Sequence, residues 1–385
     1  MADFEEKPMP VFDSKSDMLL QLIALCGELP ITEIRRLPMT TAYRYKVVGA
    51  LRQQRWIRQY VKDDIRAYRL TAAGRNHLLQ QNPERFAFLK DAGLEVNMYR
   101  SQINRRLRLH TAAQVYTTMI LAGFSIFADE KTLLFQYRQD AGNRIAYYNS
   151  SETKDLGIEG IKVRSSRATG VLLGPGRILL VYNTGQTLMK WESQTELRLY
   201  ALIESKLCRE NSVYEDDDLG GLMLGNSMDM AYELLTNSGR NKRNSFQLRD
   251  TFPRFYYCPS TTQGIQQLRC TLRPDVMADL RALLLSDLLP PAPDAIMEQD
   301  AVDAQGRPVL LALDFDMARI KRYHDACEMF QIQGHLCCYD FQAAVLEKYM
   351  AGTHAVIESV SLEKVISPMV LSQEGDSRKQ QKKTP

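Results

Sequence analysis

Three carboxylates follow two apolar segments in the C-terminal third of the chain. Asp314 and Asp316 end the run LALDFD, and Asp340 follows the run CCY. If these segments are neighbouring parallel strands, the carboxylates meet at the edge of a sheet where ligands and metals collect. Such a set could hold Mg²⁺ in a metal-dependent nuclease, and Mg²⁺ is the one cofactor the sequence suggests. We favour the alternative that Asp316 and Asp340, each directly before an expected helix, cap its free N–H groups.

Two further carboxylates lie at the start of an expected helix over residues 191–207. Glu192 and Glu196 follow Lys190 and come after an expected hairpin with the strands ATGVLLG and RILLVYN. A nuclease of the restriction-endonuclease type carries carboxylates and a lysine on its hairpin strands, where they bind Mg²⁺ and orient water. These strands contain neither Asp nor Glu. Glu192 and Glu196 are therefore weak catalytic candidates, and they are equally explained as N-terminal helix charges.

The strongest functional signal is a basic segment near the N-terminal end. Residues 31–75 contain eleven Lys and Arg against three Asp and Glu, a balance of +8. Because the whole chain carries +3, the remainder is about −5 by subtraction. A compact basic segment on an otherwise slightly acidic protein is typical of a module that binds a polyanion.

The spacing of apolar and turn residues around this segment predicts a winged helix-turn-helix over residues 15–82. The expected elements are a helix from about 17 to 26, a short helix over 31–37, a helix over 40–54, strands over 56–61 and 66–71, and a short helix over 71–81. Ser16 or Asp17 is the expected cap of the first helix and Thr40 that of the helix over 40–54, and Thr71-Ala72-Ala73-Gly74 is expected to open the last one. The apolar stripe of helix 40–54 is expected to be Ala42, Tyr45, Val48 and Leu51.

This arrangement predicts double-stranded DNA as the partner. A recognition helix lies in the major groove, where its first turns reach base edges while hydroxyl groups and cations hold phosphates. Arg44 is the best candidate for a bidentate contact to guanine. The candidate DNA-binding residues are Thr40, Thr41, Tyr43, Arg44, Lys46, Arg52, Lys62, Arg66 and Arg69. A winged helix that contacts only proteins, with a solvated basic face, is the alternative.

A further basic tract follows the expected winged helix, in a linker or bridging helix over residues 83–110. Its members are Arg100, Arg105, Arg106, Arg108 and His110. The tract either extends the DNA contact or forms a solvated helix face between domains, and the sequence does not decide between them.

The remaining chain, residues 111–370, is expected to be an α/β domain with a mixed sheet. Apolar strands over 169–173 and 178–182 flank the turn Gly174-Pro175-Gly176. Later, the apolar strands 309–313 and 335–339 are separated by a helix over 317–330, which predicts a right-handed parallel crossover. Residues 1–14 and the basic tail 371–385 are expected to be disordered.

Seven cysteines occur without a CxxC pair and without a neighbouring histidine cluster, so we expect buried reduced thiols, no disulfide framework and no metal site. The chain has no apolar stretch of 18 residues, and its acidic N-terminus lacks the apolar region of a signal peptide. The expectation is a cytoplasmic protein without membrane insertion. Phosphate-loop, dinucleotide, zinc-protease and serine-hydrolase signatures are also missing.

Several stretches together resemble the replication-relaxation proteins of Gram-positive plasmids and integrative elements. They are YRLTAAGRNHL, RRLRLHTAAQVYTTMILAGF, TGVLLGPGRILLVYNTG and WESQTELRLYALIESKL, within residues 18–210. The resemblance implies a restriction-endonuclease-like α/β domain and a role in plasmid replication or conjugative DNA processing. In that family an acidic motif usually ends the second hairpin strand. Asn183-Thr184-Gly185 stands there in this chain, so we expect a domain without nuclease activity of its own.

Two other functions stay open from the sequence alone. One is a winged-helix transcriptional regulator whose α/β domain dimerises or senses a ligand, and the other is a metal-dependent nuclease. A lone winged helix reads only a short DNA site. We therefore also expect a homodimer, held by residues beyond Thr111, that recognises a repeated half-site.

Overall fold

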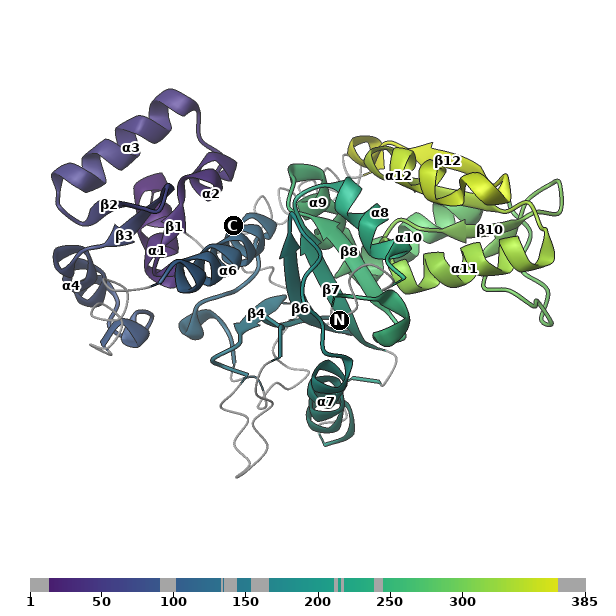
Figure 1. Cartoon of the computed structure of the whole chain (residues 1–385), viewed down its shortest axis with the longest axis horizontal. Coiled ribbons are helices and arrows are strands. Elements are labelled where there is room, and N and C mark those ends of the chain that lie inside the picture. Colours follow the sequence, from purple (N-terminus) through teal and green to yellow (C-terminus); the bar gives the residue numbers. More distant parts are fainter. Residues whose placement is uncertain are drawn as a thin grey trace, which may run out of the picture. The chain divides into compact units, whose positions relative to one another are not determined.

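The computed structural model describes residues 14–90, 102–132, 134, 144–153, 166–210, 214–215, 218–238 and 245–365 (Figure 1). Apart from Ser14, the two ends expected to be disordered lie outside these residues, as does Arg100. Within these residues the protein is a mixed α/β protein with three sheets. It divides into two compact units, Met1–Leu156 and Gly157–Pro385.

The first unit begins with helices and an antiparallel hairpin. Its elements are α1 (Lys15–Cys26), β1 (Leu29–Pro30), α2 (Ile31–Arg36), α3 (Thr41–Gln53), β2 (Ile57–Lys62), β3 (Ile65–Leu70) and α4 (Ala72–Gln81). The strand order is β1-β3-β2, and both pairings are antiparallel. Thr40 caps α3 by accepting the N–H group of Tyr43, as the sequence predicted, and Thr71 caps α4 by accepting that of Gly74. Ser14, slightly earlier than expected, caps α1.

Two short-range constraints shape the β2–β3 hairpin, residues Ile57–Leu70. Asp63 and Asp64 both adopt left-handed backbone angles, with φ of 53° and 58°, which matches the twist of a two-residue hairpin turn. At the base of the hairpin, a Cβ on Gly74 would lie 2.2 Å from the carbonyl oxygen of Trp56. Only glycine therefore lets the start of α4 approach the start of β2 this closely.

Helix α6 (Ile103–Ala122) completes the core of the first unit. It packs against α1 and β1, and it buries Ala113, Val115 and Met119. Arg36 of α2 also donates a 2.8 Å hydrogen bond to Thr118 Oγ1. The sequence predicted a separate domain from residue 111 onward. Helix α6 runs without a break from 103 to 122 and so spans that position. The unit also contains η1 (Ala87–Lys90), η2 (Ala128–Glu130) and β4 (Ala146–Asn149).

The second unit contains a mixed sheet with the strand order β5-β6-β7-β8. Its elements are β5 (Gly170–Gly174), β6 (Arg177–Gly185), α7 (Ser193–Ile203), η5 (Glu204–Arg209), β7 (Leu219–Gly225), α8 (Met228–Thr236), η7 (Leu248–Asp250) and β8 (Phe255–Pro259). Strands β5 and β6 form the predicted antiparallel hairpin, whereas β6, β7 and β8 are parallel. The ring of Tyr182 packs among Trp191, Phe252 and Phe255 in the core beside this sheet.

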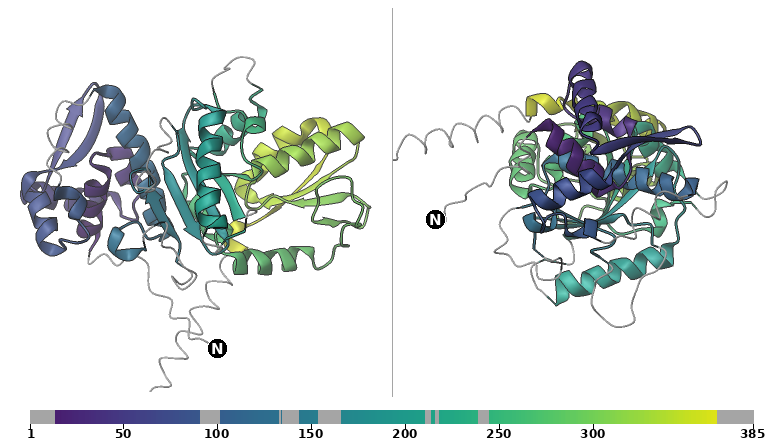
Figure 2. Two further views of the ribbon diagram at one scale, coloured as in Figure 1. Left: turned by 90° about the horizontal axis from the view of Figure 1, so that it is seen from below. Right: turned by 90° about the vertical axis from the view of Figure 1, so that its left-hand side faces the viewer.

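A second mixed sheet follows, with the order β12-β11-β10-β9. The remaining elements are α9 (Thr262–Thr271), α10 (Pro274–Leu285), β9 (Ala301–Val302), β10 (Pro308–Leu311), α11 (Met317–Phe330), β11 (His335–Tyr339), α12 (Asp340–Met350), η8 (Ala351–Thr353) and β12 (Val356–Val360). Figure 2 shows α10 on one side of this sheet and α11 and α12 on the other. Strands β10 and β11 are parallel, which confirms the predicted direction of this pair. All seven cysteines are buried free thiols, also as predicted.

The two glycines of α3 and α4 give a matched test of this packing. We expect Gly74→Ala to destabilise the first unit by about 1–3 kcal/mol, because the added methyl group overlaps the Trp56 carbonyl. Gly49→Ala should stabilise it by about 0.5–1 kcal/mol, because Gly49 lies inside α3 with no atom within 4 Å of the place an added methyl group would occupy.

Denaturant unfolding followed by tryptophan fluorescence measures both changes. The chain has two tryptophans, so a Trp191→Phe background leaves Trp56 as the only reporter, within the first unit. Equal effects of the two alanine substitutions would contradict the packing of α4 on β2.

Candidate nucleic-acid interface

Helix α3 exposes one polar and aromatic face. Thr40, Thr41, Tyr43, Lys46 and Arg52 are all exposed, as a DNA-contacting helix requires. The apolar stripe differs from the predicted one. Val47, Val48 and Leu51 are buried, whereas Ala42 is exposed and Tyr45 is 76% exposed. The reason is that only the C-terminal half of α3 packs on the core, so an apolar residue of the first turns has nothing to cover it.

Arg44 has a different environment from its neighbours in α3. Its Nη2 donates to the carbonyl oxygens of Arg35 at 3.1 Å and Met39 at 3.0 Å. The guanidinium group therefore joins the end of α2 to the start of α3. In this conformation Nη2 of Arg44 holds the turn between the two helices.

The hairpin separates its basic residues into exposed and buried ones. Lys62 and Arg66 are exposed, but Arg69 is only 2% exposed. Arg69 stacks over the ring of Tyr60, 3.7 Å from its centroid, and its Nε donates to Glu28 Oε2 at 2.8 Å. Arg69 is thus an internal residue of the hairpin, and we leave it out of the candidate surface.

Glu28, between α1 and β1, is the centre of a buried ionic cluster. Its side chain has no exposed surface, and it accepts hydrogen bonds from Arg69, from Arg106 Nε at 2.9 Å and from His110 Nε2 at 2.8 Å. Burial alone would raise the pKa of Glu28, but the hydrogen bonds from His110, Arg106 and Arg69 outweigh it and lower the pKa to about 2. The ionised Glu28 therefore makes its full contribution to folding stability above pH 4.5, the pKa of the carboxyl group in the unfolded chain. This contribution is lost as the pH falls toward 2.

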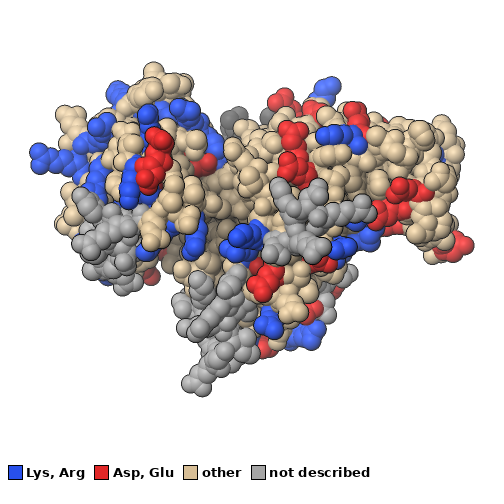
Figure 3. All heavy atoms as spheres, viewed as in Figure 1, with Lys and Arg blue, Asp and Glu red and all other residues tan. Residues whose placement is uncertain are grey.

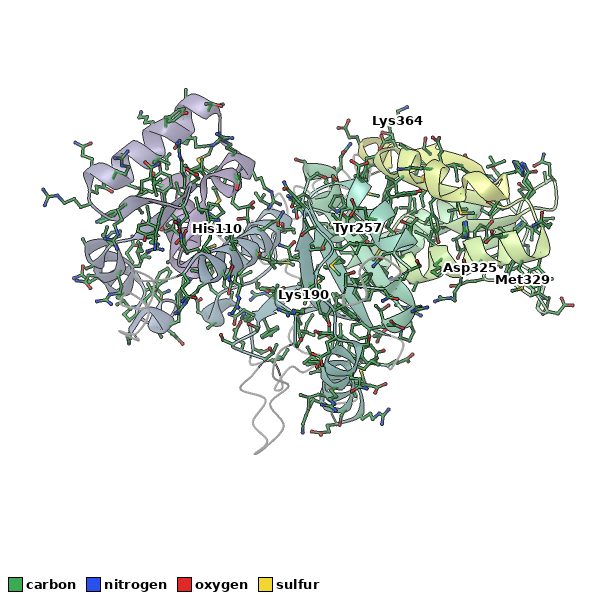
Figure 4. All side chains as sticks on the ribbon, viewed as in Figure 1. His110, Lys190, Tyr257, Asp325, Met329 and Lys364 are labelled. Atoms are coloured by element: carbon green, nitrogen blue, oxygen red, sulfur yellow. The ribbon has the colours of Figure 1, made fainter. Side chains whose placement is uncertain are left out.

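The basic tract on α6 divides in the same way. Arg105 and Arg108 are exposed, whereas Arg106 is completely buried and His110, labelled in Figure 4, bonds to Glu28. Arg106 also donates to two backbone carbonyls of the hairpin, Lys62 O at 2.6 Å from Nη1 and Ile65 O at 3.0 Å from Nη2. One helix residue thereby fixes both strand ends next to the hairpin turn.

The first unit therefore combines an inward and an outward set of cations. Among the candidate DNA-binding residues, the outward set consists of Lys46, Arg52, Lys62 and Arg66, and Figure 3 shows Lys and Arg side chains gathered over this unit. Sequence reasoning missed Glu28 and the exposure of Tyr45. A lone Glu between the apolar segments of α1 and β1 is the one sequence signal for the buried cluster, and no local signal marks Tyr45.

The late aspartates of the second unit are mostly engaged with backbone. Asp316 is the N-cap of α11, as predicted, and its Oδ1 accepts the N–H groups of Ala318 and Phe255, each at 3.1 Å. Burial and the neighbouring Asp314 raise the pKa of Asp316 to about 6. Asp340 is the first residue of α12, where it accepts the Phe341 N–H at 2.9 Å, while Tyr339 occupies the N-cap position.

The two glutamates near α7 lie in opposite environments. Glu192 is exposed at the N-cap position and makes no side-chain capping hydrogen bond within the described residues. Glu196 is fully buried, where it accepts Ser166 Oγ and the Arg167 N–H at 2.7 Å and Tyr182 OH at 3.0 Å. Burial raises the pKa of Glu196. The structure does not bring the two carboxylates into one site.

No protein-family model, curated protein or solved structure matches the chain. Within the part of the chain that the structure describes, no helix is long and apolar enough to cross a membrane.

Replacing Arg106 tests whether α6 holds the hairpin. We expect Arg106→Met to keep much of the packing of the side chain but to remove its hydrogen bonds to Lys62 O and Ile65 O. Amide hydrogen exchange in residues 57–70 should then accelerate, because the hairpin opens locally more often. Exchange in β5–β8 serves as the control and should stay the same. Unchanged protection of the hairpin would show that Arg106 does not hold it.

Substitutions of Asp314 and Asp316 distinguish a helix cap at Asp316 from an acidic site that both carboxylates share. Asp316→Ala should lower the stability of the second unit by about 2 kcal/mol, because it removes the cap of α11. Asp314→Ala should change it by less than about 0.5 kcal/mol, because within the described residues the hydrogen bond of its carboxylate is a long 3.4 Å contact to the Asp316 N–H. Unfolding of a Trp56→Phe background, which leaves Trp191, measures both. A larger loss in Asp314→Ala would contradict the assignment.

Proposed function

We propose that the first unit is a winged helix-turn-helix that binds double-stranded DNA through α3 and the β2–β3 hairpin. The observation that carries the proposal is the division of charge in this unit. Arg69 and Arg106 are buried and paired with Glu28, while Lys46, Arg52, Lys62 and Arg66 stay on the surface of α3 and the hairpin. Surface cations on these two elements are positioned to meet the phosphates on either side of a groove.

Within this proposal the first turns of α3 provide sequence recognition. Thr41, Tyr43 and Tyr45 are exposed there, and their hydroxyl groups and rings can hydrogen-bond base edges or contact thymine methyl groups. Arg44 acts on recognition indirectly, because it fixes the turn from α2 into α3. Asp63 and Asp64 are exposed at the hairpin tip. Their charge repels phosphates, so the strand residues Lys62 and Arg66 make the contact instead of the tip.

We further propose that DNA binding serves replication or conjugative processing of a plasmid or integrative element, without nuclease activity of this chain. The resemblance of residues 18–210 to replication-relaxation proteins supports the role. The lack of Asp and Glu in β5 and β6 supports the absence of cleavage. Asp316 and Glu196 are also occupied by hydrogen bonds within the protein. A homodimer would double the length of the recognised site.

Selection of bound sequences from random duplex DNA tests the proposal with the full chain. We expect affinity to fall steeply between low and moderate salt, because each neutralised phosphate releases counterions. Lys62→Ala should weaken binding to every sequence and reduce the salt slope by about 1, whereas Tyr45→Ala should lower only the preference for the selected sequence. Lys321→Ala, which removes the same charge from the second unit, is the control.

The selected sequence also separates the proposed role from transcriptional regulation. A site at an origin of replication or transfer supports the proposal, whereas promoter sites would support a regulator. An inverted or direct repeat, protected by a dimer, would support the expected pairing. Absence of DNA binding, or affinity that does not change with salt, would assign the face of α3 to a protein partner instead.

A further inference from the structure

Three side chains of different chemistry meet on one face of the β9–β12 sheet. His335 and Cys337 are two residues apart in β11, so they point to the same side of the sheet. Strand β12 runs parallel to β11 and places Glu358 directly opposite Cys337. His335 Nε2 lies 3.0 Å from Glu358 Oε2, and Cys337 Sγ lies 3.9 Å from each of these two atoms.

These separations are close to the distances between ligand atoms in a tetrahedral metal site. Zinc bonds are about 2.1 Å long to nitrogen or oxygen and about 2.3 Å long to sulfur. In a tetrahedral site they place sulfur about 3.6 Å from nitrogen or oxygen, and nitrogen about 3.4 Å from oxygen. One ion could therefore contact all three atoms after shifts of a few tenths of an ångström. His335 and Cys337 are buried, whereas the Glu358 side chain is 58% exposed. The open side of the triangle thus faces solvent, from which an ion can enter.

The second nitrogen of His335 has the partner that a metal-binding histidine usually has. Its Nδ1 lies 3.1 Å from Oδ2 of Asp303, a carboxylate that is only 4% exposed. Arg307 fixes Asp303 in turn, with its Nε 2.6 Å from the same oxygen. A carboxylate on Nδ1 keeps the proton there and leaves the lone pair of Nε2 free for a metal.

We propose that His335, Cys337 and Glu358 bind one Zn²⁺ ion or a similar transition-metal ion, with water as the fourth ligand. The mixed nitrogen, sulfur and oxygen donors favour Zn²⁺ over Mg²⁺ or Ca²⁺, which prefer oxygen ligands alone. The ion joins the edge strand β12 to β11. The sequence predicted no metal site, because CxxC pairs and histidine clusters are missing. Here the ligands are an HxC pair on one strand and a glutamate on the neighbouring strand.

The competing explanation is a protonated His335 that bridges Asp303 and Glu358 without a metal. Titration of the chelator-treated full chain with Co²⁺, followed by its absorption spectrum, distinguishes the two. We expect one equivalent of Co²⁺ to bind with a thiolate-to-cobalt band and the visible bands of a tetrahedral ion, and Zn²⁺ to displace it. Zn²⁺ should also raise the unfolding midpoint of the second unit, because the ion binds the folded state.

Two substitutions and two matched controls assign the ligands. Glu358→Gln, at an exposed position, should weaken Co²⁺ binding at least about 10-fold, the loss seen even for outer partners of a metal site. Cys337→Ser should remove the thiolate band. Glu347→Gln removes the same charge from an exposed site on α12, and Cys338→Ser changes the adjacent thiol on the opposite face. Both controls should bind Co²⁺ as the unaltered chain does.

The proposal is overturned if the unaltered chain gives no thiolate band. It is equally overturned if Glu358→Gln binds Co²⁺ as tightly as the unaltered chain, or if Cys338→Ser removes the band and Cys337→Ser does not.

Discussion

The first unit depends on the hydrogen bonds that the buried carboxylate of Glu28 accepts. It receives hydrogen bonds from β3, through Arg69, and from α6, through Arg106 and His110. Transfer of these charges from water to the interior is costly, and the attraction between them offsets that cost only when every donor has a partner. Arg106 meets this condition because its two remaining nitrogen donors bond to Lys62 O and Ile65 O.

This cluster determines which residues can reach a partner. Since Arg106 is held at the hairpin, α6 and the hairpin form one body together with α1 and β1. Lys62 and Arg66 then project from a hairpin whose strand ends are fixed. Two arginines that look suited to phosphate binding in the sequence serve inside the protein. The positions of Lys62 and Arg66 on the surface depend on these two buried arginines.

Local signals predicted the elements well, because they act within a few residues. Thr40 caps α3 and Asp316 caps α11. Long-range partners could not be predicted. Nothing near Arg106 or Arg69 in the sequence indicates that Glu28, 41 residues before Arg69 and 78 before Arg106, will accept hydrogen bonds from both. Cys337 and Glu358 likewise meet only through the parallel pairing of β11 with β12.

The central claim is that a buried charge cluster positions the hairpin that we propose binds DNA, and a double-mutant cycle in DNA affinity tests it most directly. The four proteins are the unaltered chain, Arg106→Met, Lys62→Ala and the double variant. If Arg106 positions Lys62, replacing Lys62 should weaken DNA binding less once Arg106 is gone, with a coupling energy above about 0.5 kcal/mol. Additive losses, or unaltered affinity in Arg106→Met, would contradict the account.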